Sequence, residues 1–354
     1  MRQLLATKSI SVLREQESTN QLRRALGATH LTLLGIGGII GTGIFVLTGT
    51  AAANHAGPAL PLAFIVAGIG CTLAALCYAE FAAMIPVSGS AYSYSYATLG
   101  EAVAWFIGWN LVLEYLFAVA TVSVGWSGYA VSLLDQLHVH IPAALSNAPF
   151  GTPMGQEGFD IVRTGAILNV PAVVIVAVLA TICYIGIRQS AAFNAVIVAI
   201  KVTVVVLFIL FGVSFIQSAN WHPFIPPNTG QFGVFGWSGI MGAAGVIFFA
   251  YIGFDAVSTA AQETRNPQRD MPIGILASLV ICTILYVIVS AILTGMVSYK
   301  ELDVAAPVAL ALDKYPALHW LGIPVKLGAV CGMTSVMLVM TIAQARIFFA
   351  MARD

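Results

Sequence analysis

The sequence carries very few charged residues for its length. Of its 354 residues, 8% are Asp, Glu, Lys or Arg, and 59% are hydrophobic. A soluble domain has about 25% charged residues, so the ionic groups here are too few to cover a globule in water. The composition excludes an ordinary soluble domain and indicates that the solvent of this chain is a lipid bilayer.

Patterns typical of several other protein classes are also missing. The 15 basic and 15 acidic residues balance, and no basic run extends beyond Arg23 and Arg24, so nucleic acid is not an expected partner. The five cysteines lie in apolar stretches without CxxC or Cys/His clusters, which excludes a recognisable metal site or disulfide framework. No Ser/His, Cys/His or HExxH arrangement indicates an enzyme, no ring of filter residues indicates a channel, and no ATP motif is present. We therefore expect neither an enzyme nor a cofactor.

Residues 1–28 are more polar than the rest of the chain. They mix arginine and lysine with glutamate and lack the apolar core of a cleavable signal peptide. We interpret them as a cytoplasmic N-terminal tail, followed by a single transmembrane domain over residues 29–354.

Eight windows reach the roughly 20 apolar residues that a membrane-spanning helix needs. They cover residues 31–50, 60–84, 102–134, 168–187, 192–216, 237–261, 273–297 and 325–351. The sequence therefore predicts an all-α membrane protein with about eight transmembrane helices.

Basic residues in the loops and near the ends of these windows predict the orientation in the membrane. Ten lie on the side of the N-terminus, namely Arg2, Lys8, Arg14, Arg23, Arg24, Arg188, Arg265, Arg269, Arg346 and Arg353. The other side has four, namely Arg163, Lys300, Lys314 and Lys326. Because cytoplasmic loops carry the excess of Lys and Arg, we expect both termini in the cytoplasm and the loop 135–167, with Asp160, outside the cell membrane.

The first window contains five glycines within the nine residues from Gly35 to Gly43. Each glycine costs a helix interior about 1 kcal/mol relative to alanine, so the helix is predicted to break there. Close helix packing is the alternative interpretation, because Gly37 and Gly41 have the spacing of a small-xxx-small motif. A dinucleotide-binding loop is excluded, since GxGxxG is not met in register and no strand precedes it.

Four ionisable residues lie inside the apolar windows: Glu80, Glu114, Lys201 and Asp255. A charge in the hydrocarbon region costs at least about 2.5 kcal/mol, so such residues normally face a bundle interior or a wet cavity. Asp255, together with Gly253, interrupts the sixth apolar window and predicts a second broken helix. Glu80 lies near Pro86. The alternative interpretation of Glu80 is that it reaches the membrane interface or acts as a structural partner, with no role in transport.

Lys201 lies 13 residues beyond Arg188, about 20 Å along a helix. That depth makes it hard for the ammonium group to reach the membrane surface. Burial removes hydration from the charged form, so a lysine at this depth is a candidate proton carrier. The alternative is a permanently paired structural lysine, with Asp255 or Glu114 as its partner.

Two broken segments, the first and the sixth, occupy corresponding positions if the chain is built from inverted repeats of five helices. Four blocks, at residues 35–45, 78–92, 249–258 and 263–272, closely resemble the amino acid, polyamine and organocation (APC) transporter superfamily. Within it, the chain resembles the bacterial cationic amino acid transporter (CAT) group, from about residue 20 to the last residue. The resemblance implies a LeuT-type inverted-repeat fold and proton-coupled uptake of amino acids by alternating access.

The resemblance also implies roles for individual residues. The unwound part of helix 1 would bind the substrate carboxylate, and carbonyls at the break in helix 6 would accept the substrate amino group. The implied substrate-binding residues are Ile39, Gly41, Thr42, Gly43, Glu114, Phe249, Ala250 and Ile252. Phe249 would also close the path to the outside, and Lys201 matches the helix 5 lysine of proton-coupled relatives, with the proton as coupling ion.

The remaining acidic residues have less definite implied roles. Glu114 matches a helix 3 acid that would face the far end of a cationic substrate, with a role in holding helix 3 as the alternative. Asp255 and Glu80 are expected to serve in gating or in structure, and Asp255 in binding helix ends. Whether the substrate is a neutral or a cationic amino acid stays open.

A ten-helix core needs two segments beyond the eight found here, so the second repeat is incomplete in this chain. We expect a part of a longer transporter. The alternative is a non-transporting membrane protein, either a sensor or an inert fragment, that retains the amino acid pocket.

Overall fold

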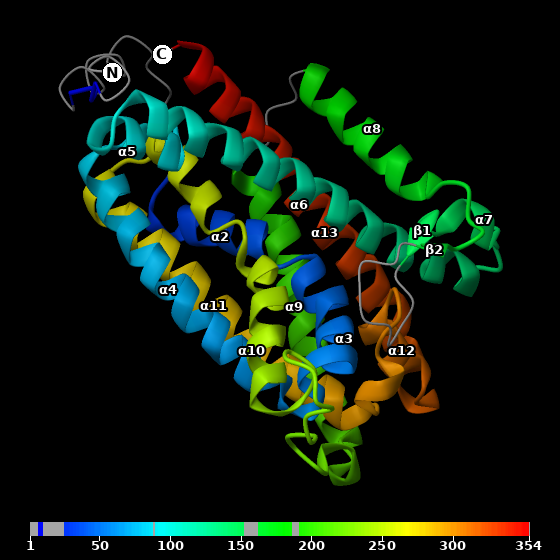
Figure 1. Ribbon diagram of the computed structural model, residues 1–354. Coiled ribbons are helices and arrows are strands. Elements are labelled where there is room, and N and C mark those ends of the chain that lie inside the picture. Colours follow the sequence, from blue (N-terminus) through cyan, green and yellow to red (C-terminus); the bar gives the residue numbers. More distant parts are fainter. Residues whose placement is uncertain (1–5, 10–24, 88, 152–161, 186–190, 354) are drawn as a thin grey trace.

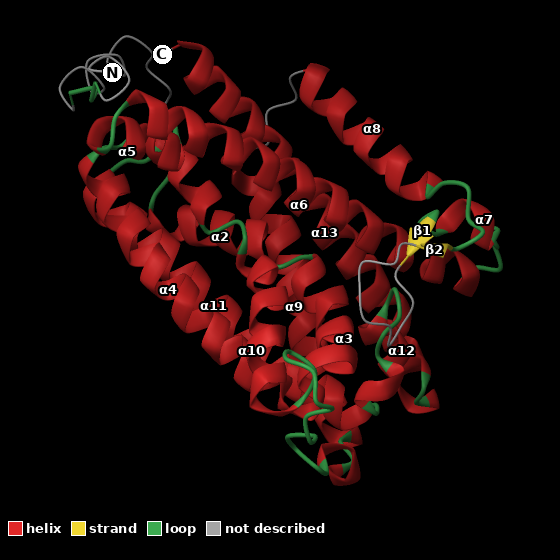
Figure 2. Ribbon diagram, in the orientation of Figure 1, coloured by secondary structure: helices red, strands yellow, loops and turns green. Residues whose placement is uncertain are grey.

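The computed structural model describes residues 6–9, 25–87, 89–151, 162–185 and 191–353. Most of the expected tail, together with Arg188 and Asp160, lies outside these residues. The described chain is a bundle of helices with a single two-stranded hairpin, β1 (Phe150–Gly151) and β2 (Val162–Arg163) (Figures 1 and 2).

Within the described residues, six helical stretches are long and apolar enough to cross a membrane. They are Gly43–Met84, Glu101–Gln136, Asn194–Phe215, Gly236–Glu263, Pro267–Met296 and Pro316–Arg353. Two shorter apolar helices, α2 (Ala28–Ile39) and α8 (Val170–Ile185), fall in the first and fourth predicted windows. Every predicted window therefore contains helix, although the boundaries differ.

The first and sixth segments are assembled from several short elements. The first comprises α2, the π-helical turn η1 (Gly43–Leu47), α3 (Thr48–Ala51) and a second π-helical turn η2 (Ala52–Ala56). Helix therefore continues six residues beyond the predicted end at residue 50. The sixth comprises α10 (Gly236–Ile247) and the 3₁₀ turns η6 (Phe248–Tyr251) and η7 (Asp255–Glu263).

The other segments are long continuous helices. The second is η3 (Gly57–Ala59) followed by α4 (Leu60–Met84), the third is α6 (Glu101–Gln136), and the fifth is α9 (Ala191–Gly212) with η4 (Val213–Phe215). The seventh is α11 (Pro267–Met296), and the eighth is α13 (His319–Arg353), preceded by η9 (Pro316–Leu318). α13 starts six residues before the predicted window because its first turn carries the polar His319, which an apolar window excludes.

Short elements connect these helices at the two ends of the bundle. They are α5 (Ser90–Thr98), α7 (Ala143–Ser146), η5 (Ser218–Trp221), η8 (Tyr299–Glu301) and α12 (Pro307–Asp313). Residues 6–9, α5 and the C-terminal end of α13 lie at one end, which we call the termini face (Figure 1). η5 and α12 lie at the opposite end, which we call the loop face (Figure 1).

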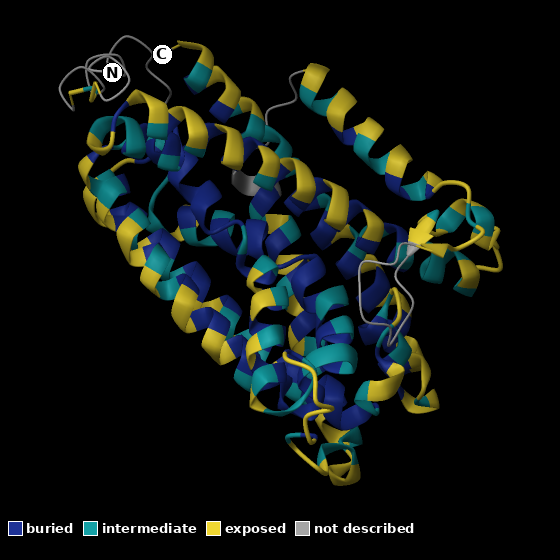
Figure 3. Cartoon of the chain, viewed as in Figure 1, coloured by how far each residue is buried: buried dark blue, intermediate teal, exposed yellow. Residues whose placement is uncertain are grey.

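The bundle buries its middle and exposes an apolar outer surface. Buried residues concentrate where the broken segments run between the long helices, and exposed residues cover the outside (Figure 3). Many exposed side chains are large and apolar, among them Ile69, Leu73, Trp105, Phe117 and Leu210. A surface of this kind is stable against lipid tails and unstable in water.

α2 lies between α9 and α11, α4 packs along α11, and α6 packs along α13. At the termini face the first and sixth segments are joined directly. The Ala25 N–H donates to the Glu263 carbonyl at 2.9 Å, and the Arg265 N–H donates to the Leu26 carbonyl at 2.8 Å. This packing places the two broken segments side by side in the centre of the bundle.

Candidate functional site

The first break lies at Ile40 and Gly41, inside the predicted stretch from Ile39 to Gly43. α2 ends at Ile39, and Ile40 adopts an extended backbone with φ −71° and ψ 102° before the chain resumes helix in η1. The first N–H groups of a helix have no intrahelical acceptor. Gly41, Thr42 and Gly43 therefore present backbone donors at the positive end of the second half-helix.

The second break lies at Ile252 and Gly253. Ile252 is extended, with φ −55° and ψ 132°, and Gly253 has φ +121°, a conformation that favours glycine. Phe249 and Ala250, which were predicted at the break, belong to the 3₁₀ turn η6 just before it. The extended residues thus begin slightly later than predicted, because Gly253 is the residue that accepts the left-handed backbone.

The two breaks touch each other through small residues. A Cβ atom added to Gly253 would lie 2.7 Å from the carbonyl carbon and oxygen of Gly38. A Cβ atom added to Gly43 would clash with Ala250. The glycines of the first window therefore both break the helix and allow close packing, so both interpretations of the glycine cluster apply.

A tyrosine hydroxyl on α11 bridges the two breaks. The Tyr286 hydroxyl lies 2.8 Å from the Ile39 carbonyl and 3.0 Å from the Ala250 carbonyl, and the residue is fully buried. The carbonyl predicted to receive a substrate amino group is therefore occupied by a protein donor in this conformation. The sequence did not single out Tyr286, because a tyrosine in an apolar helix reads as a core residue.

Lys201 lies beside the first break. Its ammonium group donates to the Gly37 carbonyl at 2.6 Å, to the Ile40 carbonyl at 3.0 Å and to the Ser335 hydroxyl at 3.2 Å. A lysine has three donors, so these acceptors satisfy the ammonium group completely. The alternative of a lysine paired with Asp255 or Glu114 is wrong, since backbone carbonyls and a hydroxyl take the place of a carboxylate.

The Thr42 side chain is the unsatisfied group of the first break. It is 2% exposed, and its Oγ1 has no hydrogen-bond partner among the described residues. A buried hydroxyl without a partner costs about 1 to 3 kcal/mol. Thr42 faces α6, where a Cβ atom added to Gly125 would lie 3.2 Å from Oγ1. A polar atom of this kind is typical of a place that receives a ligand.

Asp255 starts η7 on the side of the second break that leads to the termini face. Its carboxylate accepts a hydrogen bond from the Tyr115 hydroxyl at 2.6 Å and from the Gly253 N–H at 3.2 Å. These two bonds connect the second break to α6, and the role of Asp255 in binding helix ends stays a prediction. Glu114, the neighbour of Tyr115 on α6, lies within electrostatic range of Asp255.

Two further predicted residues, Phe249 and Glu80, lie outside the extended parts of the two breaks. Phe249 is half-buried in η6 and packs against the core. Glu80 is on the exposed side of α4, one turn before the helix ends at Met84. The structure therefore brings the break residues and Lys201 together and leaves Glu80 apart from them.

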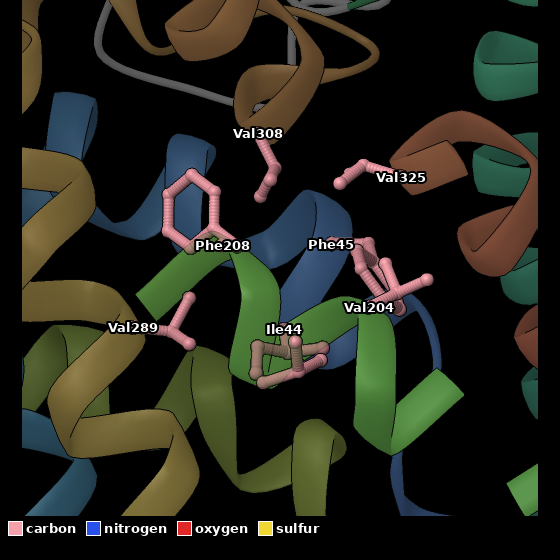
Figure 4. A pocket seen from close by; sticks show the side chains of 8 residues that line it. Ile44, Phe45, Val204, Phe208, Val289, Val308 and Val325 are labelled. Carbon is pink, nitrogen blue, oxygen red and sulfur yellow. The ribbon is translucent and has the colours of Figure 1, made fainter. Parts of the chain in front are cut away.

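A small apolar cavity lies between the first break and the loop face (Figure 4). Its volume is about 10 Å³, and side chains from η1, α9, α11, α12 and α13 surround it. The lining residues are Ile44, Phe45, Val204, Val205, Phe208, Val289, Val308 and Val325. Figure 4 shows Val308 of α12 and Phe208 of α9 pointing into the same space. α12 therefore covers the break on this side.

Hydrogen bonds hold this cover in place. The Tyr129 hydroxyl of α6 donates to the Phe45 carbonyl of η1 at 2.7 Å. The Lys326 ammonium group of α13 lies 3.0 Å from an Asp313 carboxylate oxygen at the end of α12 and 3.2 Å from the Gln136 amide oxygen of α6. The site is thus closed toward the loop face by apolar packing, with polar bonds around its edge.

Within the described residues, no group of three or more His, Cys, Asp or Glu side chains is placed to hold a metal ion. The chemistry available at the breaks consists of backbone donors, backbone acceptors, one buried amine and hydroxyl groups. The chemistry of such a set is compatible with binding a small zwitterion and with exchanging a proton, and among the described residues it offers no nucleophile activated by a neighbouring base.

Sequence comparison identifies the family. Residues 30–354 match the Amino acid permease family. The chain is 47% identical over 354 residues to a methylthioribose transporter of Bacillus subtilis, covering 100% of this chain and 72% of that protein. It is 50% identical over 334 residues to the branched-chain amino acid permease BcaP of the same organism, covering 94% and 68%. It spans 56% of cationic amino acid transporter 9 of Arabidopsis thaliana, at 39% identity over 95% of this chain.

Structural comparison identifies the fold. The crystal structure of MhsT in complex with L-phenylalanine superposes with a TM-score of 0.62 at 13% sequence identity, covering 94% of this chain and 78% of that one. The two broken segments in corresponding positions are the mark of the LeuT-type fold, which the sequence had predicted. With this fold and the family match, the chain belongs to the amino acid permease family of the APC superfamily and is a transporter rather than an enzyme.

Proposed function

We propose that this chain carries the substrate and proton sites of a proton-coupled amino acid transporter that works by alternating access. The observation that carries the proposal is the contact between Lys201 and the first break. One ammonium group binds the Gly37 carbonyl in the last turn of α2, the Ile40 carbonyl at the break, and also Ser335 on α13. Its protonation state and the geometry of the break are therefore linked.

The size of this link is sufficient for a transport cycle. A hydrogen bond from a charged group contributes about 1.5 to 3 kcal/mol. Deprotonation of Lys201 removes one such donor. At about 1.4 kcal/mol per factor of ten, the balance between the closed conformation and an open one shifts about 10-fold to 150-fold. A proton on Lys201 can therefore take the role that the sodium ion has in sodium-coupled transporters.

The substrate would bind across the two breaks. Its carboxylate would accept hydrogen bonds from the free N–H groups of Gly41 to Gly43 and from the unsatisfied Thr42 hydroxyl. Its amino group would donate to the carbonyls of Phe249, Ala250 and Ile252, where it competes with the Tyr286 hydroxyl for the Ala250 carbonyl. Phe249 would close the site on the outer side, while Asp255 keeps the second break in shape.

Small neutral amino acids with branched apolar side chains are the substrates that we propose first. The side chains closest to the break glycines are apolar, with Val336 beside Gly41 and Met340 beside Gly253. This choice agrees with the 50% identity to a branched-chain amino acid permease. Glu114 is the group that would favour a substrate with a cationic side chain. Because Glu114 lies near Asp255, we propose cationic amino acids as the second choice of substrate.

We also propose that the termini face is cytoplasmic and that the membrane is the cell membrane. Described basic residues gather at the termini face: Lys8 bonds to α5, Arg265 bonds to Leu26, Arg269 is in the first turn of α11, Arg346 pairs with Glu263, and Arg353 ends α13. The Lys and Arg excess of cytoplasmic loops supports this orientation.

The test is uptake by the 354-residue chain in proteoliposomes with an inward proton gradient. One proton entering down 100 mV provides about 2.3 kcal/mol, enough for about 50-fold accumulation of a neutral substrate. We expect proton-driven accumulation of radiolabelled leucine, isoleucine and valine, with arginine and methylthioribose as comparison substrates. Lys201→Met should remove the proton dependence while leaving binding measurable by thermal shift.

Lys314→Met is the matched control, because Lys314 forms an exposed ion pair with Glu301 at 3.0 Å and lies away from the breaks. It should transport like the wild type. Binding without accumulation would contradict the transport proposal for this chain and would favour a sensor instead. An unchanged pH dependence in Lys201→Met would remove Lys201 from the coupling mechanism.

A further inference from the structure

α9 places a second buried polar residue on the same face as Lys201. Asn194 precedes Lys201 by seven residues, two helical turns and about 10 Å along the axis. Helical side chains lean toward the N-terminus of their helix, so the long lysine points back along α9 toward Asn194. Both side chains meet the same residue of α2. The Lys201 ammonium group binds the Gly37 carbonyl, and the Asn194 amide oxygen lies 3.1 Å from where a Gly37 Cβ atom would be.

Asn194 has an unmet hydrogen-bonding requirement. The residue is 5% exposed, and its Oδ1 has no hydrogen-bond partner among the described residues. A buried amide oxygen left in this way costs about 1 to 3 kcal/mol. Buried polar groups of this kind are normally satisfied by an ordered water that bonds to two or more protein groups. The Lys201 ammonium group binds the same residue, Gly37, so a water on the Asn194 Oδ1 would lie beside it and would receive an N–H that turns away from Ser335.

The partners of Lys201 permit both of its charge states. The ammonium form uses all three acceptors, Gly37, Ile40 and Ser335. The Ser335 hydroxyl itself donates to the Gly332 carbonyl at 2.8 Å. For release, the N–H that donates to Ser335 turns toward the neighbouring water, that N–H bond breaks, and the proton passes to the water while the bonding electron pair stays on the nitrogen. The neutral amine keeps two donors for the two carbonyls. Its lone pair can then accept a hydrogen bond from the Ser335 hydroxyl after that hydroxyl rotates.

A proton from Lys201 has few other acceptors nearby. On α2 the facing groups are backbone carbonyls, and on α13 the facing group is the Ser335 hydroxyl. On α11 the facing titratable group is the Cys282 thiol, which is fully buried. Asn194 lies on the opposite side of Lys201 from the apolar cavity and toward the start of α9, the end nearer the termini face (Figure 1).

We propose that Asn194 holds a water molecule beside Lys201 and that this water carries the lysine proton to solvent at the termini face. Asn194 is then a positioning residue for proton release, and the apolar cavity keeps the proton from leaving toward the loop face. This inference rests on the proposed proton coupling through Lys201. It adds the side on which the proton leaves and the residue that controls its departure.

The test separates net transport from exchange in proteoliposomes. Net uptake driven by a proton gradient requires Lys201 to release its proton in every cycle. Exchange of internal unlabelled leucine for external labelled leucine proceeds with the proton retained. Asn194→Leu, which keeps the size and removes the polar group, should slow net uptake by about tenfold or more. It should leave exchange and thermal-shift binding of leucine at wild-type levels.

Two further variants keep the result interpretable. Asn194→Ser retains a polar group that can hold a water and should recover most of the net uptake. Asn110→Leu is the matched control, because Asn110 is exposed on α6 and donates to its own helix at the Phe106 carbonyl. It should behave like the wild type in both assays.

Three outcomes distinguish the proposals. Equal net uptake in Asn194→Leu and in the wild type would overturn the role of Asn194 and leave the proposed function standing. Equal loss of net uptake, exchange and binding in both Asn194 variants would also overturn it, because that pattern indicates a packing residue. Wild-type uptake that ignores the proton gradient would defeat the proposed function itself.

Discussion

Tyr286→Phe removes one oxygen atom from the point where the two broken segments meet. The phenyl ring should remain in place, since the Tyr286 ring packs against Phe64 at a centroid distance of 5.3 Å and against Tyr251 at 5.5 Å. What disappears is the hydroxyl shared between the Ile39 and Ala250 carbonyls. The substitution therefore tests whether this bridge holds the breaks in the closed conformation.

The expected magnitude follows from the two carbonyls that lose their donor. Leaving a buried acceptor unsatisfied costs about 1 to 3 kcal/mol, and one hydroxyl proton serves both carbonyls, so we expect about 1 to 3 kcal/mol in total. That loss applies to the closed conformation and shifts the population about 5-fold to 150-fold toward an open one. The Ala250 carbonyl also becomes free for the substrate. Apparent leucine affinity should rise while the maximal uptake rate falls.

Thermal-shift titration measures the affinity, and initial rates in proteoliposomes measure turnover. Tyr251→Phe is the control, because the Tyr251 hydroxyl donates at 2.9 Å to the Phe64 carbonyl in α4. It removes a buried hydrogen bond of the same type and should lower stability by a similar amount without raising affinity. If Tyr286→Phe leaves both affinity and rate unchanged, or if Tyr251→Phe reproduces its effects, the bridge is not a link between the breaks.

Three further predictions concern other contacts. Lys326→Met should leave thermal stability nearly unchanged, because its partner Asp313 is half-exposed at 44%. The same substitution should speed the labelling of Val308→Cys by an impermeant maleimide, because α12 loses its ion pair with α13. Arg346→Gln breaks an ion pair at 2.8 Å whose side chains are 35% and 31% exposed, so thermal unfolding should show less than about 1 kcal/mol of loss, and less still at high salt. Gly245→Ala in α10 meets open space and should raise stability by up to about 1 kcal/mol in the same assay without changing uptake.

Hydropathy was sufficient to locate the apolar helical segments, because each one exposes apolar side chains on one side and buries them on the other. It was insufficient at their ends. The first segment continues to Ala56 through two π-helical turns, and α13 begins at His319. In both places polar side chains lie in the helix near the loop face, where a sliding apolar window stops too early. The connecting helices α5 and α12 are too short for such a window.

The site was predicted where one residue type carries the signal by itself. Glycine density located the first break, and the depth of Lys201 in its helix indicated a buried amine. The partners of Lys201 could not be read from the sequence, because two of them are backbone carbonyls and the third is Ser335, an ordinary residue in an apolar helix. Tyr286 and Asn194 were missed for the same reason. Their roles depend on which helices are neighbours, and only the packed structure shows this.

The contact between the breaks also sets how freely the sequence can vary. Gly38 and Gly253 meet backbone to backbone, and neither residue can become smaller. A substitution at either position therefore has no compensating partner, and we expect both to be intolerant in a mutational scan. A Cβ atom added to Gly43 would clash with the Ala250 methyl group and would also lie 2.5 Å from the Ala250 Cα. Gly43→Ala should therefore be harmful, and adding Ala250→Gly should not rescue it, because the backbone atom stays in place.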